Sequence, residues 1–171
     1  MAALGRLAMR GNVSHLQLIR YSIQNRYESM CYEVYLSTDS QEDLTFRNSA
    51  LVRFKVVDPS TDPGIRLLDY PQCWYVGSKS ECSCTFRHLH STELGFGEPV
   101  EWYPEEQDEI EATRELYATL TSLLSSGYHV DLLDQWHGAP PEDITTLDVS
   151  LGDVPENAFR LFENHKFRLK R

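Results

Sequence analysis

The residues with the most recognisable chemistry in this sequence are two cysteines and two histidines that follow a polar loop. Cys82, Cys84, His88 and His90 are spaced as Cys-x-Cys-x-x-x-His-x-His. Thiolate and imidazole are ligand types that zinc prefers in proteins. The pattern therefore raises the hypothesis of a zinc site, and Cys73, on the preceding predicted strand, is the natural third cysteine.

Strand geometry argues against a single ion bound by all four residues. In a strand these side chains share one face, but Cys82 and His90 would lie about 26 Å apart at about 3.3 Å per residue. Zinc bonds are only about 2.0 to 2.3 Å long. Neither glycine nor proline lies between Cys82 and His90 to turn the chain. We therefore interpret them first as strand residues, with Cys82, Cys84, Cys73 and His88 as the metal candidates.

Thiol chemistry is the alternative for the same segment. The basic neighbours Lys79 and Arg87 would lower the pKa of a nearby thiol, which favours a redox-active or otherwise reactive cysteine. A nucleophilic Cys84 would need a histidine within about 3 Å and a third group to orient it. His88 and Glu93 are close in sequence but form no recognised catalytic signature.

Two further polar clusters have structural explanations as well as functional ones. Asp131, Asp134 and His137 surround Trp136 after a predicted strand, where loops often carry function. We interpret them as a solvated loop anchored by the tryptophan. The acidic run at residues 105–111 would suit a docking face, but a helix dipole favours acidic residues in its first turn anyway.

Period-two patterns predict the strands that would position these residues. Residues 31–38, 51–57 and 72–78 alternate and are rich in aromatic and β-branched types. Residues 82–90 are predicted to return from a loop at 77–81 as a fourth strand. The simplest arrangement is an antiparallel hairpin of strands three and four at the centre of the sheet.

One long amphipathic helix is predicted over residues 104–126. Apolar side chains recur at helical spacing, Pro104 suits its first turn, and Gly127 provides a stop. Residues 128–132, 145–151 and 159–169 are predicted as further strands, the last interrupted at 163–165 by a turn or a bulge. The basic tail at 166–171 would shield an edge strand from pairing with another molecule.

These elements predict an α+β fold, a mainly antiparallel sheet of about six strands with the helix packed on one face. Helix, glycine and strand in succession also allow a parallel strand at 128–132. With 171 residues, the chain is long enough for one domain with an ordinary core. No apolar run reaches the roughly 20 residues that span a bilayer.

Charge divides the chain into two regions. Residues 1–29 hold four arginines and one acidic residue, Glu28, so their net charge is +3. Residues 30–171 have a net charge of −13, which gives −10 for the whole chain. We interpret 1–29 as a basic, dispensable N-terminal extension and 30–171 as the single domain. The alternatives are a short docked helix near residues 13–20 and mitochondrial targeting; Met30 could itself be a start.

The predicted function is a non-catalytic acidic interaction or binding domain whose partner is a basic protein. A body of charge −13 repels phosphate backbones, which disfavours nucleic acid as a partner. The alternative is a metal-binding or thiol-dependent enzyme centred on residues 82–84, with zinc as the only cofactor considered. Cysteines without a predicted secretory leader favour a reducing, cytoplasmic location.

Overall fold

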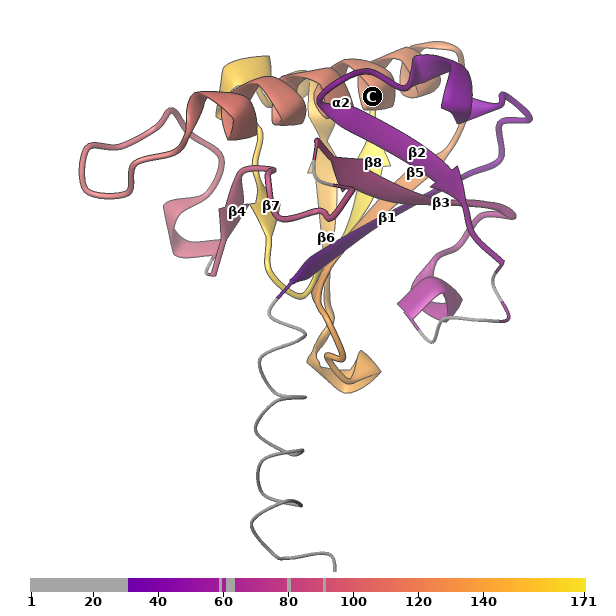
Figure 1. Cartoon of the computed structure of the whole chain (residues 1–171). Helices are drawn as coiled ribbons and strands as arrows, with labels where there is room; N and C mark the ends of the chain where they lie inside the picture. Colours follow the sequence, from indigo (N-terminus) through magenta and orange to yellow (C-terminus); the bar gives the residue numbers. More distant parts are fainter. Residues whose placement is uncertain (1–30, 59, 61–63, 80, 91) are drawn as a thin grey trace, which may run out of the picture. The chain divides into compact units, whose positions relative to one another are not determined.

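The computed structural model describes residues 31–58, 60, 64–79, 81–90 and 92–171, and the predictions about residues 1–29 lie outside them. Cys31–Arg171 forms one compact unit. It has the predicted α+β architecture, in which one α-helix lies across one face of a six-stranded, mostly antiparallel sheet (Figure 1). Within these residues, no helix is long and apolar enough to cross a membrane.

The main sheet has the strand order β2-β3-β1-β5-β8-β6. Every neighbouring pair is antiparallel except β6 and β8, which run parallel. A separate parallel pair is formed by β4 and β7. The strand bounds are β1 Tyr32–Thr38, β2 Val52–Val56, β3 Gln72–Ser78, β4 His88–Leu89, β5 Val130–Trp136, β6 Thr145–Ser150, β7 Leu161–Phe162 and β8 His165–Lys170.

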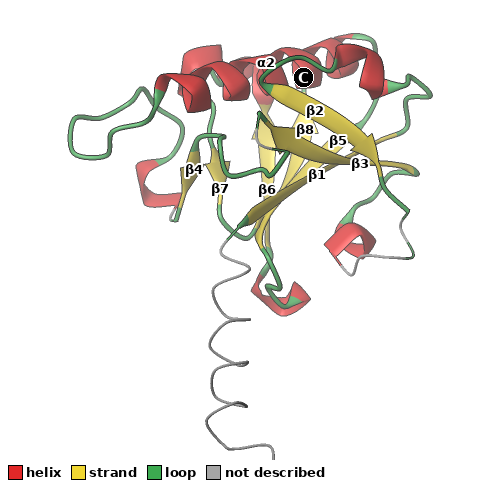
Figure 2. Cartoon of the chain, in the orientation of Figure 1, coloured by secondary structure: helices red, strands yellow, loops and turns green. Residues whose placement is uncertain are grey.

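Helix α2, Gln107–Ser125, forms where the apolar spacing predicts it. Gly127, at a φ of 87°, ends it in the left-handed conformation, and the Tyr128 amide donates to the Leu123 carbonyl at 3.2 Å. Short 3₁₀ helices lie in the connections between the main elements (Figure 2). They are η1 Leu44–Arg47, η2 Gly64–Leu67, η3 Thr92–Leu94, η4 Pro141–Asp143, η5 Leu151–Asp153 and η6 Glu156–Ala158.

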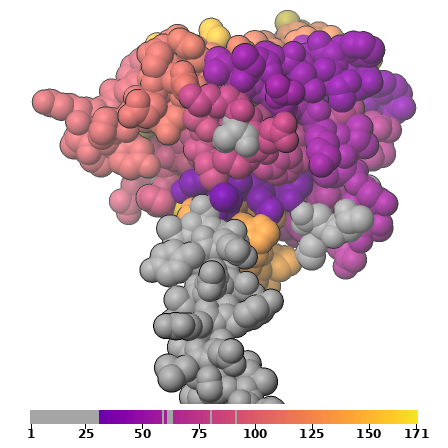
Figure 3. Space-filling model, in the orientation of Figure 1, coloured from indigo at the N-terminus to yellow at the C-terminus, as the bar shows by residue number. Residues whose placement is uncertain are grey.

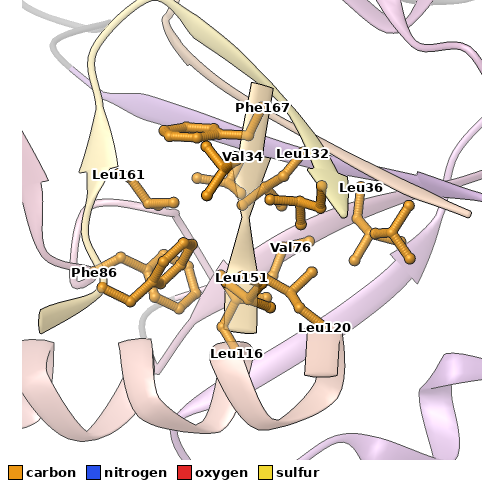
Figure 4. Packing of buried hydrophobic residues seen from close by; sticks show 14 of the residues in the cluster. Val34, Leu36, Val76, Phe86, Leu116, Leu120, Leu132, Leu151, Leu161 and Phe167 are labelled. Carbon is orange, nitrogen blue, oxygen red and sulfur yellow. The ribbon is translucent and has the colours of Figure 1, made fainter. Parts of the chain in front are cut away.

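The main core lies between α2 and the sheet. Leu116 and Leu120 of the helix pack with the sheet residues Val34, Leu36 and Leu132 (Figure 4). Each such buried side chain stabilises the fold by about 1.5 to 3 kcal/mol. A smaller cluster, which includes Tyr35, Ile65, Cys73 and Leu133, covers part of the opposite face. Both faces of the sheet are therefore covered, at least in part.

The predicted central hairpin is wrong. Residues 82–86 are turns and bends, and only His88–Leu89 is a strand, paired with β7 and not with β3. Strand β3 pairs with β1 and β2, and the centre of the sheet is β1 and β5. The alternation of 82–90 was misleading because buried turn residues also mix apolar and polar types.

Three predictions about the C-terminal half are also settled. β5 pairs antiparallel with both neighbours, so the parallel alternative for residues 128–132 is wrong. The interruption at 163–165 is a turn, with Asn164 at a φ of 57°, that separates β7 from β8. The basic tail belongs to β8, which lies between β5 and β6, so it does not shield an edge.

Candidate functional site

The segment around Cys82 is a tight turn held between two strands. Ser83 is fully buried; its hydroxyl accepts from the Val34 amide at 2.9 Å and donates to the Val76 carbonyl at 2.8 Å. Glu81, at a φ of 63°, takes the left-handed conformation usually left to glycine. The expectation that the chain cannot turn here without glycine or proline is therefore wrong.

This turn brings together three thiols. The Cys84 amide donates to the Cys82 sulfur at 3.4 Å, and the thiols of Cys82 and of Cys31, which precedes β1, both lie close enough to the Cys84 thiol to raise its pKa. The expected third cysteine, Cys73, lies on β3 in the cluster that covers the opposite face, where its thiol donates to the Tyr70 carbonyl at 3.5 Å. None of the four cysteines forms a disulfide bond within the described residues.

The Cys84 thiol is poorly suited to ionise. Burial and its two thiol neighbours raise its pKa to about 12, although a hydrogen bond from the Tyr32 backbone opposes this. The basic residues expected to lower it are engaged elsewhere, because Arg87 pairs with Glu105 and Lys79 pairs with Asp108. The electrostatic part of the reactive-thiol prediction is therefore wrong for Cys84.

We expect Cys84 to react with iodoacetamide near neutral pH on the order of a thousandfold more slowly than a free thiol, whose pKa is about 8.5. Thiolate is the reactive form, and burial keeps this thiol protonated. Peptide mapping by mass spectrometry over a time course measures the rate. The same protein in denaturant is the control, and equal labelling of Cys84 in both states would contradict the prediction.

His88 is a buried histidine whose two ring nitrogens are both within hydrogen-bonding distance of a partner. Its Nδ1 lies 2.9 Å from Oδ2 of Asp134, and its Nε2 lies 2.8 Å from the Ser83 carbonyl. The carbonyl can only accept, so Nε2 carries a proton. One more proton lies between Nδ1 and the carboxyl oxygen, and with it the buried pair has no net charge.

Burial and charge pairing have opposite effects on the pKa values of His88 and Asp134. Burial alone disfavours an imidazolium, but the Asp134 carboxylate outweighs this and raises the pKa of His88. Burial likewise raises the pKa of Asp134, although His88 opposes it. Both shifts keep the shared proton in place. Within the described residues, the second oxygen of Asp134, Oδ1, is buried without a hydrogen-bond partner.

Tyr32 covers the imidazole. The two rings are stacked, with centroids 3.9 Å apart and planes 6° apart, and Trp136 meets Tyr32 edge to face at 5.0 Å. The Tyr32 hydroxyl donates to Glu163 at 3.1 Å, and His90 lies 2.8 Å from the same carboxylate oxygen. Burial and the nearby Glu163 charge raise the pKa of Tyr32, so it stays a donor.

A hollow of about 330 Å³ opens above these residues. A second hollow of about 460 Å³ adjoins it, since His90 and Trp136 line both. We call the two together the acidic groove. Its walls come from β1, the 82–90 segment, the start of α2 and the turns after β5 and β7: Tyr32, Cys84, Phe86, His88, His90, Tyr103, Pro104, Glu105, Glu109, Trp136, His137, Gly138, Ala139, Pro140, Asp143, Glu163 and Asn164.

A buried charge cluster fixes one wall of the acidic groove. The Arg87 guanidinium donates to both Glu105 oxygens, at 2.9 and 2.7 Å, and to three backbone carbonyls, those of Gly97, Asn157 and Phe159. Arg160 also pairs with Glu105 at 3.4 Å, and all three side chains are at most 2 % exposed. This cluster joins the loop before α2, seen projecting in pink to orange in Figure 3, to β4 and β7.

The cluster predicted around Trp136 does not form one site. Asp134 lies on the face of the sheet that α2 covers and contacts His88. Asp131 lies on the opposite face and contacts Ser37 and Lys166. His137 pairs with Glu33 at 2.8 Å. Trp136 is half-buried at the end of β5, and Asp131 and Asp134 are fully buried strand residues, so the interpretation of this cluster as a solvated loop anchored by the tryptophan is wrong.

The acidic run at 105–111 is mostly structural. Glu105 belongs to the buried charge cluster, and Glu109 accepts from the Glu106 amide at 3.0 Å as a helix cap. Glu111 accepts from Gln107 at 2.8 Å. Of this run, Glu105 and Glu109 also line the acidic groove.

The metal candidates are only partly brought together. Cys82 and Cys84 are adjacent, His88 has both ring nitrogens engaged, and Cys73 is on the other face. Across the described residues, no group of three or more His, Cys, Asp or Glu side chains is placed to hold a metal ion. The zinc hypothesis stays a prediction.

Sequence reasoning missed Tyr32, Tyr103 and Glu163 as site residues. Tyr32 and Glu163 are 131 positions apart, and no local pattern links them. Comparison with known proteins adds no candidates: no protein family matches the chain, and no curated protein or solved structure does.

Proposed function

We propose that residues 31–171 form a non-catalytic binding domain that takes a basic segment of a partner protein into the acidic groove. The observation that carries the proposal is the combination of aromatic walls and carboxylates in two neighbouring hollows that share His90 and Trp136. Lysine or arginine side chains suit this combination, because their stems pack on rings and their charged ends seek carboxylates.

The first hollow supplies the aromatic surface. Tyr32, Phe86, Tyr103 and Trp136 line it, and Trp136 continues into the second hollow. A cation held over such a ring gains about 0.5 to 2 kcal/mol, more where water is excluded. These rings therefore favour a cationic side chain over an anionic one.

The second hollow supplies carboxylates near the surface. Glu163 and Asp143 line it, and Glu109 lines the first hollow. Glu163 already accepts from Tyr32 and His90, but a carboxylate has about four acceptor positions. The net charge of −13 on residues 30–171 would also steer a basic partner towards this surface.

The test uses a short peptide of alternating lysine and glycine, and calorimetry measures its binding at low and at physiological ionic strength. We expect the wild-type protein to bind it, more weakly as salt rises. The double substitution Asp143→Asn with Glu163→Gln should weaken binding about tenfold, since two charges at the groove are lost.

The matched control is Asp153→Asn with Glu156→Gln, which removes the same charge from two exposed residues outside both hollows. This control should bind as the wild type does. Equal weakening by both double substitutions would mean general charge attraction and would overturn the groove assignment. Absence of binding at low ionic strength would overturn the proposal.

The alternative function, a thiol or metal enzyme centred on residues 82–84, has less support. The raised pKa of Cys84 keeps it protonated, and both His88 nitrogens are already hydrogen-bonded. A reducing, cytoplasmic location belongs to the proposal, because cysteines that form no disulfide bond persist in that compartment.

A further inference from the structure

A third hollow, separate from the acidic groove, lies on the opposite face of the sheet, and its chemistry differs from that of the groove. It has a volume of about 500 Å³ and is lined by residues of β1, β2, β3 and the turns beside them. We call it the β2–β3 hollow. Its charged side chains include Arg53 and Lys55, both exposed on β2, in a protein that is acidic overall.

Strand register places the two cations beside an aromatic floor. Lys55 lies directly opposite Tyr75, which in turn lies opposite Tyr35 across β3 and β1. The two tyrosine rings meet edge to face at 5.6 Å and line the hollow together. A planar ring can therefore pack on tyrosine while a charged group on it reaches β2.

Gly77 lines the hollow beside Arg53. The two residues are opposite in register, so Arg53 has no side chain directly across from it on β3. A Cβ atom at Gly77 would lie 2.9 Å from the Glu81 carbonyl oxygen, which only glycine avoids. The backbone of the turn after β3 therefore packs directly on Gly77.

The two cations are available to a ligand. Among the described residues, neither Arg53 nor Lys55 forms an ion pair, whereas Arg47, Arg87 and Lys166 all do. Two adjacent cations favour a dianion such as phosphate, and arginine matches its oxygens in a bidentate manner. Glu81 also lines the hollow, which disfavours a second anionic group on that side.

The edge of β2 is closed to an added strand. The side chain of Asn48 accepts from the Phe54 amide at 2.6 Å and donates to the Phe54 carbonyl at 3.4 Å. This occupies backbone groups that an extended peptide would need. The hollow is therefore better suited to a small ligand than to a partner strand.

From these contacts we propose that the β2–β3 hollow binds a small aromatic phosphate monoester, with the ring on Tyr35 and Tyr75 and the phosphate at Arg53 and Lys55. Its volume is in the usual range for such ligands. Long-range repulsion of the phosphate by the acidic protein is screened beyond about 8 Å at physiological salt, so the nearby cations dominate the electrostatic interaction with the phosphate. The proposal is independent of the acidic groove.

Calorimetry on the full chain tests it with two probes, adenosine monophosphate and free phosphotyrosine. At least one should bind ten times more tightly than its unphosphorylated ring compound and than inorganic phosphate. Preference for one probe identifies the source of the phosphate monoester, a nucleotide or a phosphorylated tyrosine, and either preference supports the site.

Arg53→Gln should weaken binding about tenfold or more, because it removes charge-assisted hydrogen bonds to phosphate. Arg114→Gln, a change of the same kind at an exposed residue of α2, should leave it unchanged. The proposal is overturned if neither probe binds more tightly than inorganic phosphate, or if both variants behave alike.

Discussion

Replacing Glu105 with glutamine is expected to lower the free energy of unfolding by about 3 to 5 kcal/mol, the usual effect of removing one partner from a buried ion pair. Glu105 is the only carboxylate that Arg87 and Arg160 contact within the described part of the chain. Without it, two guanidinium groups that are at most 2 % exposed would lose their counterion.

Little reserve exists to absorb this loss. Domains of this size are stable by about 5 to 15 kcal/mol in total. Burial already lowers the pKa of Arg160, although Glu105 opposes this, so keeping the charge has a cost. Among the described residues, its Nε forms no hydrogen bond and has only the 3.4 Å ion-pair contact with Glu105. The amide of a glutamine would also turn a donor towards one of the guanidinium groups.

Urea unfolding followed by circular dichroism measures the effect. The matched control is Glu101→Gln, the same change at an exposed position in the same loop. It should change stability by less than about 0.5 kcal/mol. Equal midpoints for the two variants would show that Glu105 does not neutralise the cluster.

Replacing His88 with alanine is the second large effect, a loss of about 3 to 5 kcal/mol in unfolding free energy. The change removes the ring stacked on Tyr32 and leaves the Asp134 carboxyl, which is fully buried, without its partner. His90→Ala is the control, because its side chain is 71 % exposed although it also pairs with a carboxylate. Similar losses in both variants would contradict the prediction.

The same pair gives stability a pH dependence of known sign. The folded state raises the pKa of His88, so this contribution is fully present below the unfolded value of about 6.5. It is lost as pH rises through the folded pKa, by about 1.4 kcal/mol per pH unit for one proton. The raised pKa of Asp134 acts in the same direction, since the folded pair keeps a proton that the unfolded chain releases.

Asp134→Asn isolates this effect. Asparagine is close in shape and can donate to His88, but it carries no charge to hold the proton. Wild-type stability should therefore fall towards that of the variant as pH rises above 6.5, with unfolding measured at several pH values. A difference between the two proteins that is constant with pH would exclude the shared proton as its cause.

The acidic groove and the β2–β3 hollow lie on opposite faces of one sheet and have opposite charge. Residues on alternate positions of a strand point to opposite faces, so β1 supplies Tyr32 to the groove and Tyr35 to the hollow. One strand thereby contributes an aromatic ring to each site. The two binding experiments can be done on the same protein, with variants that affect one face at a time.

Local sequence was enough to predict most of the fold. The α2 stripe and the alternation in β1, β2 and β3 are periodic over five or more residues, and burial of one face requires that periodicity. Gly127 ends α2 as predicted, because only a left-handed residue closes the helix there. The order of these elements predicted the α+β class, and the length of the chain predicted a domain with an ordinary core.

What only the tertiary structure decided is which residues meet. The spacing of Cys82, Cys84 and His88 drew attention to the right segment, but the buried hydroxyl of Ser83 folds it into a turn and not a strand. Cys31 then replaces Cys73 as the neighbouring thiol, and Asp134 arrives from β5 to hold His88. Such contacts depend on strand order and register. His88 and Asp134 are 46 positions apart, and no local sequence pattern can specify that they meet.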